Sequence, residues 1–334
     1  MADVVIVVGA RRGREPVPVA EIRQMAGRAG RRHGGLACEA HVLVDAEDVS
    51  RMEDGLEGGD KFQVSSTLSS CDEMMFHLLP EICNGVVDSL SAADNWYNKS
   101  FAAVTGKKQD MRVVLEKLVE CGAATALYEE VTGTEMGKIS ADLYLHPLDL
   151  RAWRDNFEEL FEMGLEKDDA AVAWALGGVP GAEAVGDLGS HRHVFSMFRD
   201  ALPSELESKP GTVVQSVLWW SALGGPSVGK MRNKVLELRS DFGRVSKALM
   251  RLNKIGDWGM DKFFVGLEAR MKRGVPEHLS ELCEIEGMSK GLASYLYDVG
   301  VKTRRDIGSR IEDLTEDMDE KSAAFLREVA DVSN

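Results

Sequence analysis

The chain has 334 residues, a formal net charge of -15, 44% hydrophobic residues and 28% charged residues. This length and composition predict a soluble globular protein of two or three domains and exclude a disordered chain. The acidic balance argues against a protein that coats nucleic acid by bulk charge, but it is compatible with a local basic surface.

Cysteine usage and the length of hydrophobic runs predict a cytoplasmic protein. The five cysteines are scattered without a C-x-x-C pair, which is typical of reduced thiols and predicts no structural zinc site. His191 and His193 lie close together, but two histidines without a third ligand predict no metal site. No hydrophobic run reaches the roughly 18–20 residues of a membrane helix, and the N-terminus carries no export signal.

The first fifty residues predict a small α/β segment. Val4 to Val8 form a continuous β-branched run, typical of a strand buried on both faces of a parallel sheet. A helical pattern begins at Val19 and carries an arginine-rich stretch, and residues 36–44 predict a second strand. Residues 45–62 are acidic and glycine-rich and are expected to form a linker.

Helical patterns dominate from Ser69 onwards. Three of them precede a short turn within residues 126–147, which gives the order helix, helix, helix, β-wing of a winged-helix module. Residues 149–275 are mostly helical and include a long helix from residue 228 to 254. Two short helices are expected after Pro276, around a hairpin turn at residues 285–291.

The run QMAGRAGR, residues 24–31, concentrates positive charge in an acidic protein. Helix positions three and four apart share one face, so Gln24, Arg28 and Arg31 are expected to point the same way. Gly27 and the glycine three residues later remove side-chain bulk and allow close approach to the backbone. Two guanidinium groups on one face suit the charge of a triphosphate. The alternative is a basic surface helix that merely solvates itself.

The segment VAEIRQMAGRAGR resembles the sixth motif of superfamily 2 helicases, in the branch of the archaeal fork-repair DNA helicases and the helicase part of DNA polymerase theta. ADVVIVV stands where that family has the strand after its fifth motif. Residues 132–147, with Thr-x-x-Gly and Tyr-Leu-x-Pro, resemble the family's winged-helix end. Residues 267–307 resemble the end of its ratchet domain and a following helix-hairpin-helix, whereas residues 150–225 match only by helical character.

The resemblance implies a mainly α fold with a small α/β N-terminal remnant. It implies that the chain is the C-terminal part of such a helicase and begins inside the second motor domain. The expected domains are a remnant of the second RecA-like motor domain with the arginine motif (1–50), a winged-helix-like domain (51–148), a helical ratchet domain (149–275) and a helix-hairpin-helix domain (276–334).

The family carries its ATP-binding motifs upstream of the matched region, and this sequence has no D-E-x-H box. Residues 224–230 fit G-x-x-x-x-G-K, but Met231 lacks the hydroxyl that would hold Mg²⁺, so we interpret this segment as a turn that opens a helix. The chain alone is therefore expected to bind no cofactor. ATP and Mg²⁺ would bind in a site completed by a separate motor chain, with Arg28 and Arg31 as catalytic residues and Gln24 and Gly27 beside the nucleotide.

The long helix predicts a track for DNA phosphates, because four cations recur along it at intervals of three, four and three residues. The resemblance implies the same track, and a solvated helix face is the alternative. One tryptophan in a glycine-rich break is a candidate for stacking on a base, although tryptophans are more often in the core. The hairpin turn after Ile285 either binds phosphate or is purely structural. The candidate DNA-binding residues are Arg232, Arg239, Arg244, Lys247, Arg251, Lys254, Trp258, Gly287, Ser289 and Lys290.

Three functions remain open on this sequence. The first is the DNA-binding C-terminal portion of an ATP-dependent 3′-to-5′ DNA helicase of replication or repair, with single-stranded or forked DNA and a separate motor subunit as partners. The second is a helicase-derived DNA-binding or regulatory module without ATPase activity. The third is an adaptor whose basic residues bind an acidic protein.

Overall fold

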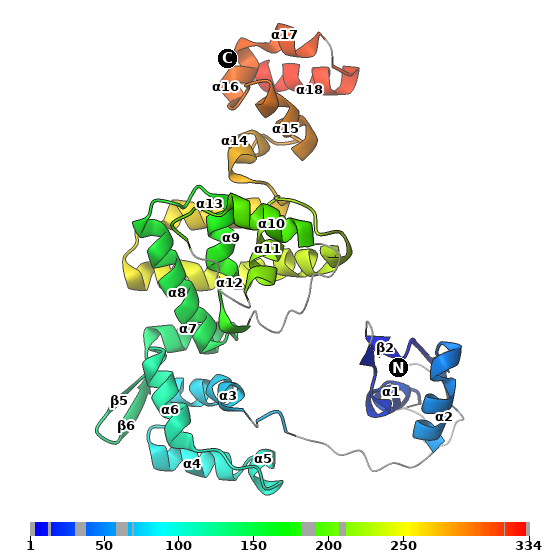
Figure 1. Cartoon of the computed structure of the whole chain (residues 1–334), viewed down its shortest axis with the longest axis vertical. Helices are drawn as coiled ribbons and strands as arrows, with labels where there is room; N and C mark the ends of the chain where they lie inside the picture. Colours follow the sequence, from blue (N-terminus) through cyan, green and yellow to red (C-terminus); the bar gives the residue numbers. More distant parts are fainter. Residues whose placement is uncertain are drawn as a thin grey trace. The chain divides into compact units, whose positions relative to one another are not determined.

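The computed structural model describes residues 4–12, 15–30, 38–57, 66–68, 70–181, 192–206, 212–316 and 318–331. The described residues are mainly helical, which confirms the predicted mainly α fold (Figure 1). The chain divides into two compact units, residues 1–66 and residues 67–334. None of the described helices is long and apolar enough to cross a membrane.

The N-terminal unit is a two-stranded parallel sheet with helices. β1 (Val4–Val8) pairs with β4 (Glu39–Leu43), so that Val8 lies opposite Leu43. Between the two strands the chain forms a short hairpin and helix α1 (Val19–Ala26), which packs against both strands. The other elements are β2 (Arg11–Arg12), β3 (Glu15–Pro16), η1 (Ala46–Asp48) and α2 (Val49–Glu57). The core contains Val7, Ala10, Val17, Ile22 and Met52.

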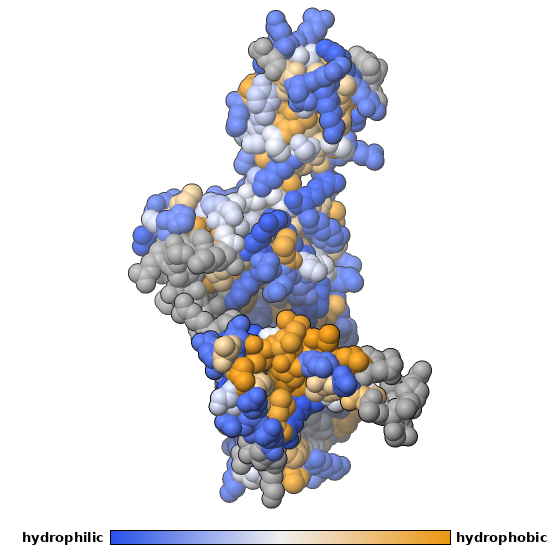
Figure 2. Space-filling view, turned by 90° about the vertical axis from the view of Figure 1, so that its right-hand side faces the viewer, coloured by the Kyte–Doolittle hydropathy of each residue, from blue (hydrophilic) through white to orange (hydrophobic). Residues whose placement is uncertain are grey.

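β1 is not buried on both faces, so that prediction is wrong for the described residues. Val7 is buried, but Val4, Ile6 and Val8 are 48%, 60% and 79% exposed. Side chains alternate between the two faces of a strand, and α1 covers only one face of this sheet. The result is an uncovered apolar surface, and Figure 2 shows hydrophobic side chains gathered over this unit.

The expected linker at residues 45–62 is also wrong over its first part, because η1 and α2 occupy residues 46–57. Met52 is spaced four residues from Leu56, and both pack into the core of the unit. Asp48 is buried and accepts hydrogen bonds from Arg11 (Nε to Oδ2, 2.7 Å) and Arg51 (Nη2 to Oδ1, 3.3 Å). The bond from Arg11 is the main reason that the pKa of Asp48 lies below its ordinary value.

The second unit begins with helices followed by a β-hairpin. Serine or aspartate side chains cap the start of each helix, which explains where the helices begin: Ser70, Ser89, Ser100 and Asp110. The elements are α3 (Cys71–Cys83), α4 (Leu90–Asn98), α5 (Phe101–Val104), α6 (Met111–Glu120), β5 (Ala124–Leu127) and β6 (Glu130–Gly133). β5 and β6 pair antiparallel, and the strands and helices share one core. The sequence predicts this order, in which helices are followed by a short two-stranded hairpin.

The Thr-x-x-Gly motif positions helix α7 (Glu135–Leu143). The Thr134 hydroxyl donates to the Gly122 carbonyl (2.7 Å) and accepts from the Gly137 N–H (3.0 Å), so it caps the helix. Gly137 has no room for a side chain, because a Cβ there would lie 2.0 Å from the carbonyl oxygen of Ala123. The motif is therefore a close junction between the hairpin and α7.

A helical bundle follows, with α9 at its centre, where every residue of that helix after Asp169 is buried. α12 confirms the long helix expected at residues 228–254, shifted by a few residues. The bundle helices are α8 (Pro147–Glu162), α9 (Asp169–Gly177), α10 (Arg192–Ala201), α11 (Val213–Ala222), α12 (Arg232–Gly256) and α13 (Asp261–Arg273).

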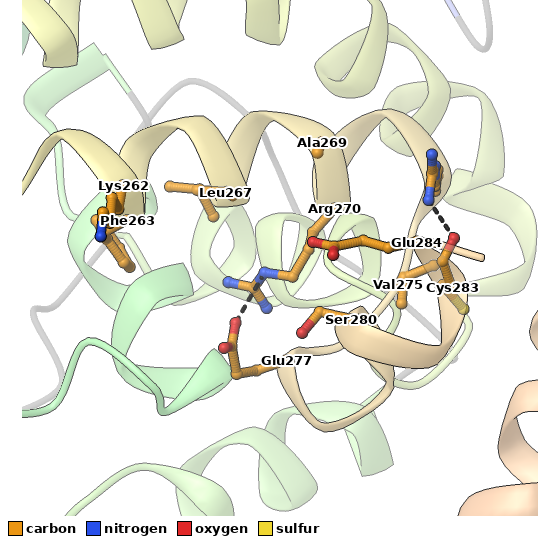
Figure 3. A pocket seen from close by; sticks show the side chains of 12 residues that line it. Lys262, Phe263, Leu267, Ala269, Arg270, Val275, Glu277, Ser280, Cys283 and Glu284 are labelled. Carbon is orange, nitrogen blue, oxygen red and sulfur yellow. Dashed lines mark hydrogen bonds and ion pairs between the residues drawn. The ribbon is translucent and has the colours of Figure 1, made fainter. Parts of the chain in front are cut away.

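The last part of the chain has its own core and more helices than the two expected. Its elements are η5 (Glu277–Leu279), α14 (Ser280–Cys283), α15 (Lys290–Asp298), α16 (Arg304–Ser309), α17 (Ile311–Thr315) and α18 (Glu320–Asp331). Buried Arg270 joins this part to the bundle, because it pairs with Asp169 of α9 (2.6 Å) and with Glu277 (3.0 Å). Figure 3 shows the pair between Arg270 and Glu277. Arg273 donates to the Cys283 carbonyl.

Candidate nucleic-acid interface

The arginine stretch does not form one continuous helix. α1 ends at Ala26, and the next residues form a turn in which Arg28 N–H bonds back only three residues, to Met25. Gly27 follows the last helical residue, and glycine has a low helix propensity. Gly30 has φ of +71°, so the backbone at that residue is not helical. The expectation that Gln24 and Arg28 share a helical face is therefore wrong in its geometry. Arg31 lies outside the described residues.

Arg28 is exposed in this turn, and within the described part of the chain it makes neither a hydrogen bond nor an ion pair. Gln24 and Gly27 are exposed beside it. Arg23 differs, because its guanidinium donates to the carbonyl oxygens of Gly55 (2.9 Å) and Leu56 (2.6 Å) in the last turn of α2. Arg23 is thus a structural cap for a helix end, and Arg28 is available for a ligand.

The glycine at position 30 serves close packing within the chain. A Cβ at Gly30 would lie 2.6 Å from Sγ of Cys38, just before β4. The sequence predicts that this glycine lets a ligand come close to the backbone. In the structure it is Cys38 of the same chain that comes close.

The four cations predicted for the DNA track lie on one face of α12. Two of them, Arg244 and Arg251, contact α7 or the residue that follows it. Arg244 donates to the carbonyl oxygen of Tyr144 (2.7 Å) and pairs with Asp241 (2.7 Å). Arg251 pairs with Asp142 of α7 (2.8 Å). These arginines fasten the long helix to the end of α7, and their charges are already partly neutralised.

The two lysines of the same face are different. Lys247 and Lys254 are exposed and make no hydrogen bond or ion pair with any residue that the structure describes. Lys247 lies near Glu268, whose lowered pKa comes mainly from hydrogen bonds with Lys272 and Ser246 and only in small part from Lys247. The open charges of this face are therefore the lysines.

Trp258 packs inside an aromatic cluster. Its ring centroid lies 5.5 Å from that of Phe161 and 6.2 Å from that of Phe264, and its indole N–H donates to Glu158 (3.4 Å). Trp258 is half-buried. Its assignment as a base-stacking residue stays a prediction.

The hairpin turn between α14 and α15 forms where the sequence places it. Ser289 caps α15 by accepting from the Leu292 N–H (3.2 Å). Gly287 has φ of +84°, and a Cβ there would lie 2.9 Å from the Phe325 ring. Lys290 turns away from the hairpin, and its ammonium donates to the carbonyl oxygens of Gly224 and Gly274.

The segment that fits G-x-x-x-x-G-K is a turn between helices, which confirms our interpretation. Helix α11, not a strand, precedes it, and α12 begins just after Met231. A Cβ at Gly224 would lie 2.7 Å from the Gly274 carbonyl oxygen, so this glycine permits two turns to touch. Arg232 is exposed at the start of α12, and Arg239 donates to the carbonyl oxygen of Ala222 (2.9 Å).

Sequence reasoning missed the acidic partners of the arginines. Asp241 precedes Arg244 by three residues, so the helical spacing alone could have revealed that pair. Asp142 lies more than a hundred residues from Arg251 and has no such signal. Among the described residues, no three histidine, cysteine or acidic side chains converge into a metal-binding group.

Comparison with known proteins relates this chain to DNA helicases. No protein-family model matches it. The ATP-dependent DNA helicase Hel308 of Aeropyrum pernix is 23% identical over 336 aligned positions, which cover 90% of this chain and 43% of that protein. Hel308 of Pyrococcus horikoshii is 22% identical over 88% of this chain and 44% of its own length. Hel308 of Pyrobaculum calidifontis is 31% identical over 146 residues, which are 40% of this chain.

The predicted resemblance to the archaeal branch of superfamily 2 DNA helicases is thereby confirmed, and it runs along almost the whole chain. The chain spans less than half the length of these curated relatives.

Proposed function

We propose that this chain is the DNA-binding portion of an ATP-dependent DNA helicase, whose ATP site is completed by polypeptide outside these 334 residues. Similarity to Hel308 helicases over 90% of the chain supports a role at this level. In this proposal Arg28 and Arg31 approach the triphosphate, ATP and Mg²⁺ bind only in the completed site, and the motor part is a separate subunit.

The arrangement of elements supports a domain assignment within this proposal. We assign the N-terminal unit to the arginine-bearing part of a RecA-like motor domain. The helices and hairpin up to residue 148 would be the winged-helix domain, and α8 to α13 the ratchet domain. The helices after residue 275 would be the helix-hairpin-helix domain, with the α14–α15 turn as its first hairpin.

The exposed, unpaired state of Arg28 is the observation that carries the proposal. An arginine that serves a nucleotide must keep its donors free until the phosphate arrives, and Arg28 does so among the described residues. The neighbouring Arg23 shows the structural alternative, because its donors are used on the end of α2.

The uncovered face of β1 supports further polypeptide at this unit. Parallel sheets are normally covered on both faces, because burial of their β-branched side chains stabilises them. Val4, Ile6 and Val8 instead stand exposed on one face. The motor polypeptide is the occupant that this proposal assigns to that face.

A mixing experiment tests the nucleotide part of the proposal. The chain would be combined with the part of a Hel308 helicase that precedes the matched region, and DNA-stimulated phosphate release would be measured. An arginine that contacts the transferred phosphate contributes about 10³–10⁵ to the rate. We therefore expect Arg28→Ala and Arg31→Ala each to abolish measurable release while DNA affinity changes little.

Arg12→Ala is the matched control, because Arg12 is a surface arginine of the same unit whose partner is Glu21. It should retain the parent rate. DNA binding without phosphate release in any mixture would instead favour a helicase-derived regulatory module. Failure to bind DNA at all would favour the adaptor.

A further inference from the structure

A small pocket lies where the helical bundle meets the C-terminal helices. Its volume is about 240 Å³, and its walls come from the α11–α12 turn, from α12 and from the start of α15. The polar residues around it are Ser221, Ser227, Arg232, Arg239 and Lys290. The pocket therefore gathers three cations from two distant parts of the sequence.

None of the residues that line this pocket is acidic. Arg239 and Lys290 bind backbone carbonyl oxygens rather than carboxylates. The pocket in Figure 3 differs, because Arg270 in its wall pairs there with Glu277. Arg270 also pairs with Asp169 of α9. In the pocket that contains Arg232, Arg239 and Lys290, no lining carboxylate among the described residues neutralises the positive charge.

The cations of this pocket keep donors for a ligand. Arg239 uses Nε and Nη2 on the end of α11, which leaves Nη1 without a described partner. Lys290 uses two of its three N–H groups, and Arg232 uses none on any described residue. Burial lowers the pKa of Lys290, and the nearby Arg239 lowers it further. A bound anion would offset both effects.

We propose that this pocket binds one phosphate group of the DNA backbone, held by Arg232, Arg239 and Lys290. This proposal rests on the proposed function and names a contact within it. The carbonyl bonds of Arg239 and Lys290 hold the two cations in place before the ligand arrives, so little side-chain entropy is lost on binding. The contact would fix the DNA at the boundary between the bundle and the C-terminal helices.

The test measures the salt dependence of single-stranded DNA binding by the full chain. Each phosphate neutralised on a single strand contributes about 0.7 to the slope of log affinity against log salt. Arg232→Gln and Lys290→Gln should each lower the slope by about 0.7, and the double variant should lower it by no more, because both cations serve one phosphate. Lys290→Arg should keep the parent slope. Arg199→Gln, which changes an exposed arginine of α10, is the charge-matched control and should keep it too.

A second measurement does not depend on DNA. Inorganic phosphate should raise the melting temperature of the parent above that found in chloride at equal ionic strength, and the double variant should lose this rise. If the variants bind DNA with the parent slope, the pocket proposal is overturned and the proposed function stands. If the chain binds no DNA, the proposed function fails. A phosphate effect equal in parent and double variant overturns the pocket in either case.

Discussion

Arg251 of the long helix α12 forms an ion pair with Asp142 of α7, with 2.8 Å between Nη1 and Oδ2. The sequence presents Arg251 as one of four equivalent cations on a DNA track. The structure makes it half of a neutral pair, whereas Lys247 and Lys254 on the same face stay open. The four positions should therefore respond differently to substitution.

Removing the acidic partner should strengthen DNA binding. Asp142→Asn frees the charge of Arg251, so we expect affinity for single-stranded DNA to rise a few-fold and the salt slope to steepen by about 0.7. Lys247→Gln and Lys254→Gln should each flatten the slope by a similar amount, and Arg251→Gln should do so less. Fluorescence anisotropy across a salt series measures all four. An equal gain in Glu312→Gln, which removes an exposed acid from α17, would show that net charge alone is responsible.

Gly137→Ala should destabilise the unit at residues 67–334. The added Cβ meets the carbonyl oxygen of Ala123 at 2.0 Å, and a backbone atom cannot yield as a side chain can. We expect a loss of about 2–3 kcal/mol in the free energy of unfolding. Urea unfolding followed by tryptophan fluorescence measures it. Gly266→Ala is the matched control, because its Cβ meets nothing within 4 Å in a helix, and it should stabilise by about 0.5–1 kcal/mol.

The buried Arg270 should be essential for the junction between the bundle and the C-terminal helices. Arg270→Met leaves the carboxylate of Asp169 without its cation, which typically costs about 3–5 kcal/mol. Thermal unfolding should show a large fall in melting temperature. Lys272→Met, which breaks an exposed pair on the same helix, should change it much less. Similar shifts in both variants would contradict a structural role for the buried ion group.

Acid should loosen the N-terminal unit through Asp48. Its pKa in the folded chain lies below the ordinary value of 3.8, chiefly because Arg11 donates to it. The carboxylate therefore contributes stability that is fully present above the ordinary pKa and is lost as pH falls through the lowered, folded value. Hydrogen exchange of residues 4–12 and 39–57, corrected for intrinsic rates, should speed up in that range.

Asp48→Asn provides the comparison for this titration. It cannot ionise, so it should exchange faster than the parent at neutral pH and should lack the acid-dependent step at this site. A parent-like acid transition in Asp48→Asn would assign the step to another group.

The sequence by itself determined several local elements and the resemblance to DNA helicases. It predicted helices before a short hairpin in residues 69–147, the long helix that is α12, and the turn at residues 285–291. These features depend on neighbours within a few residues, so they can be read along the chain. The motifs at residues 19–31 and 132–147 were specific enough to indicate DNA helicases, and comparison with known proteins agrees.

Only the tertiary structure decided which charges are free. Whether Arg251 is open depends on Asp142, and whether Arg23 is open depends on the end of α2, and both partners are distant in sequence. The burial of β1 likewise depends on what covers each face of the sheet, and its uniform run of β-branched residues does not reveal this. The sequence shows only that a residue is arginine. Whether its guanidinium caps a helix, pairs with an aspartate or stays exposed for a phosphate depends on the atoms that folding brings around it.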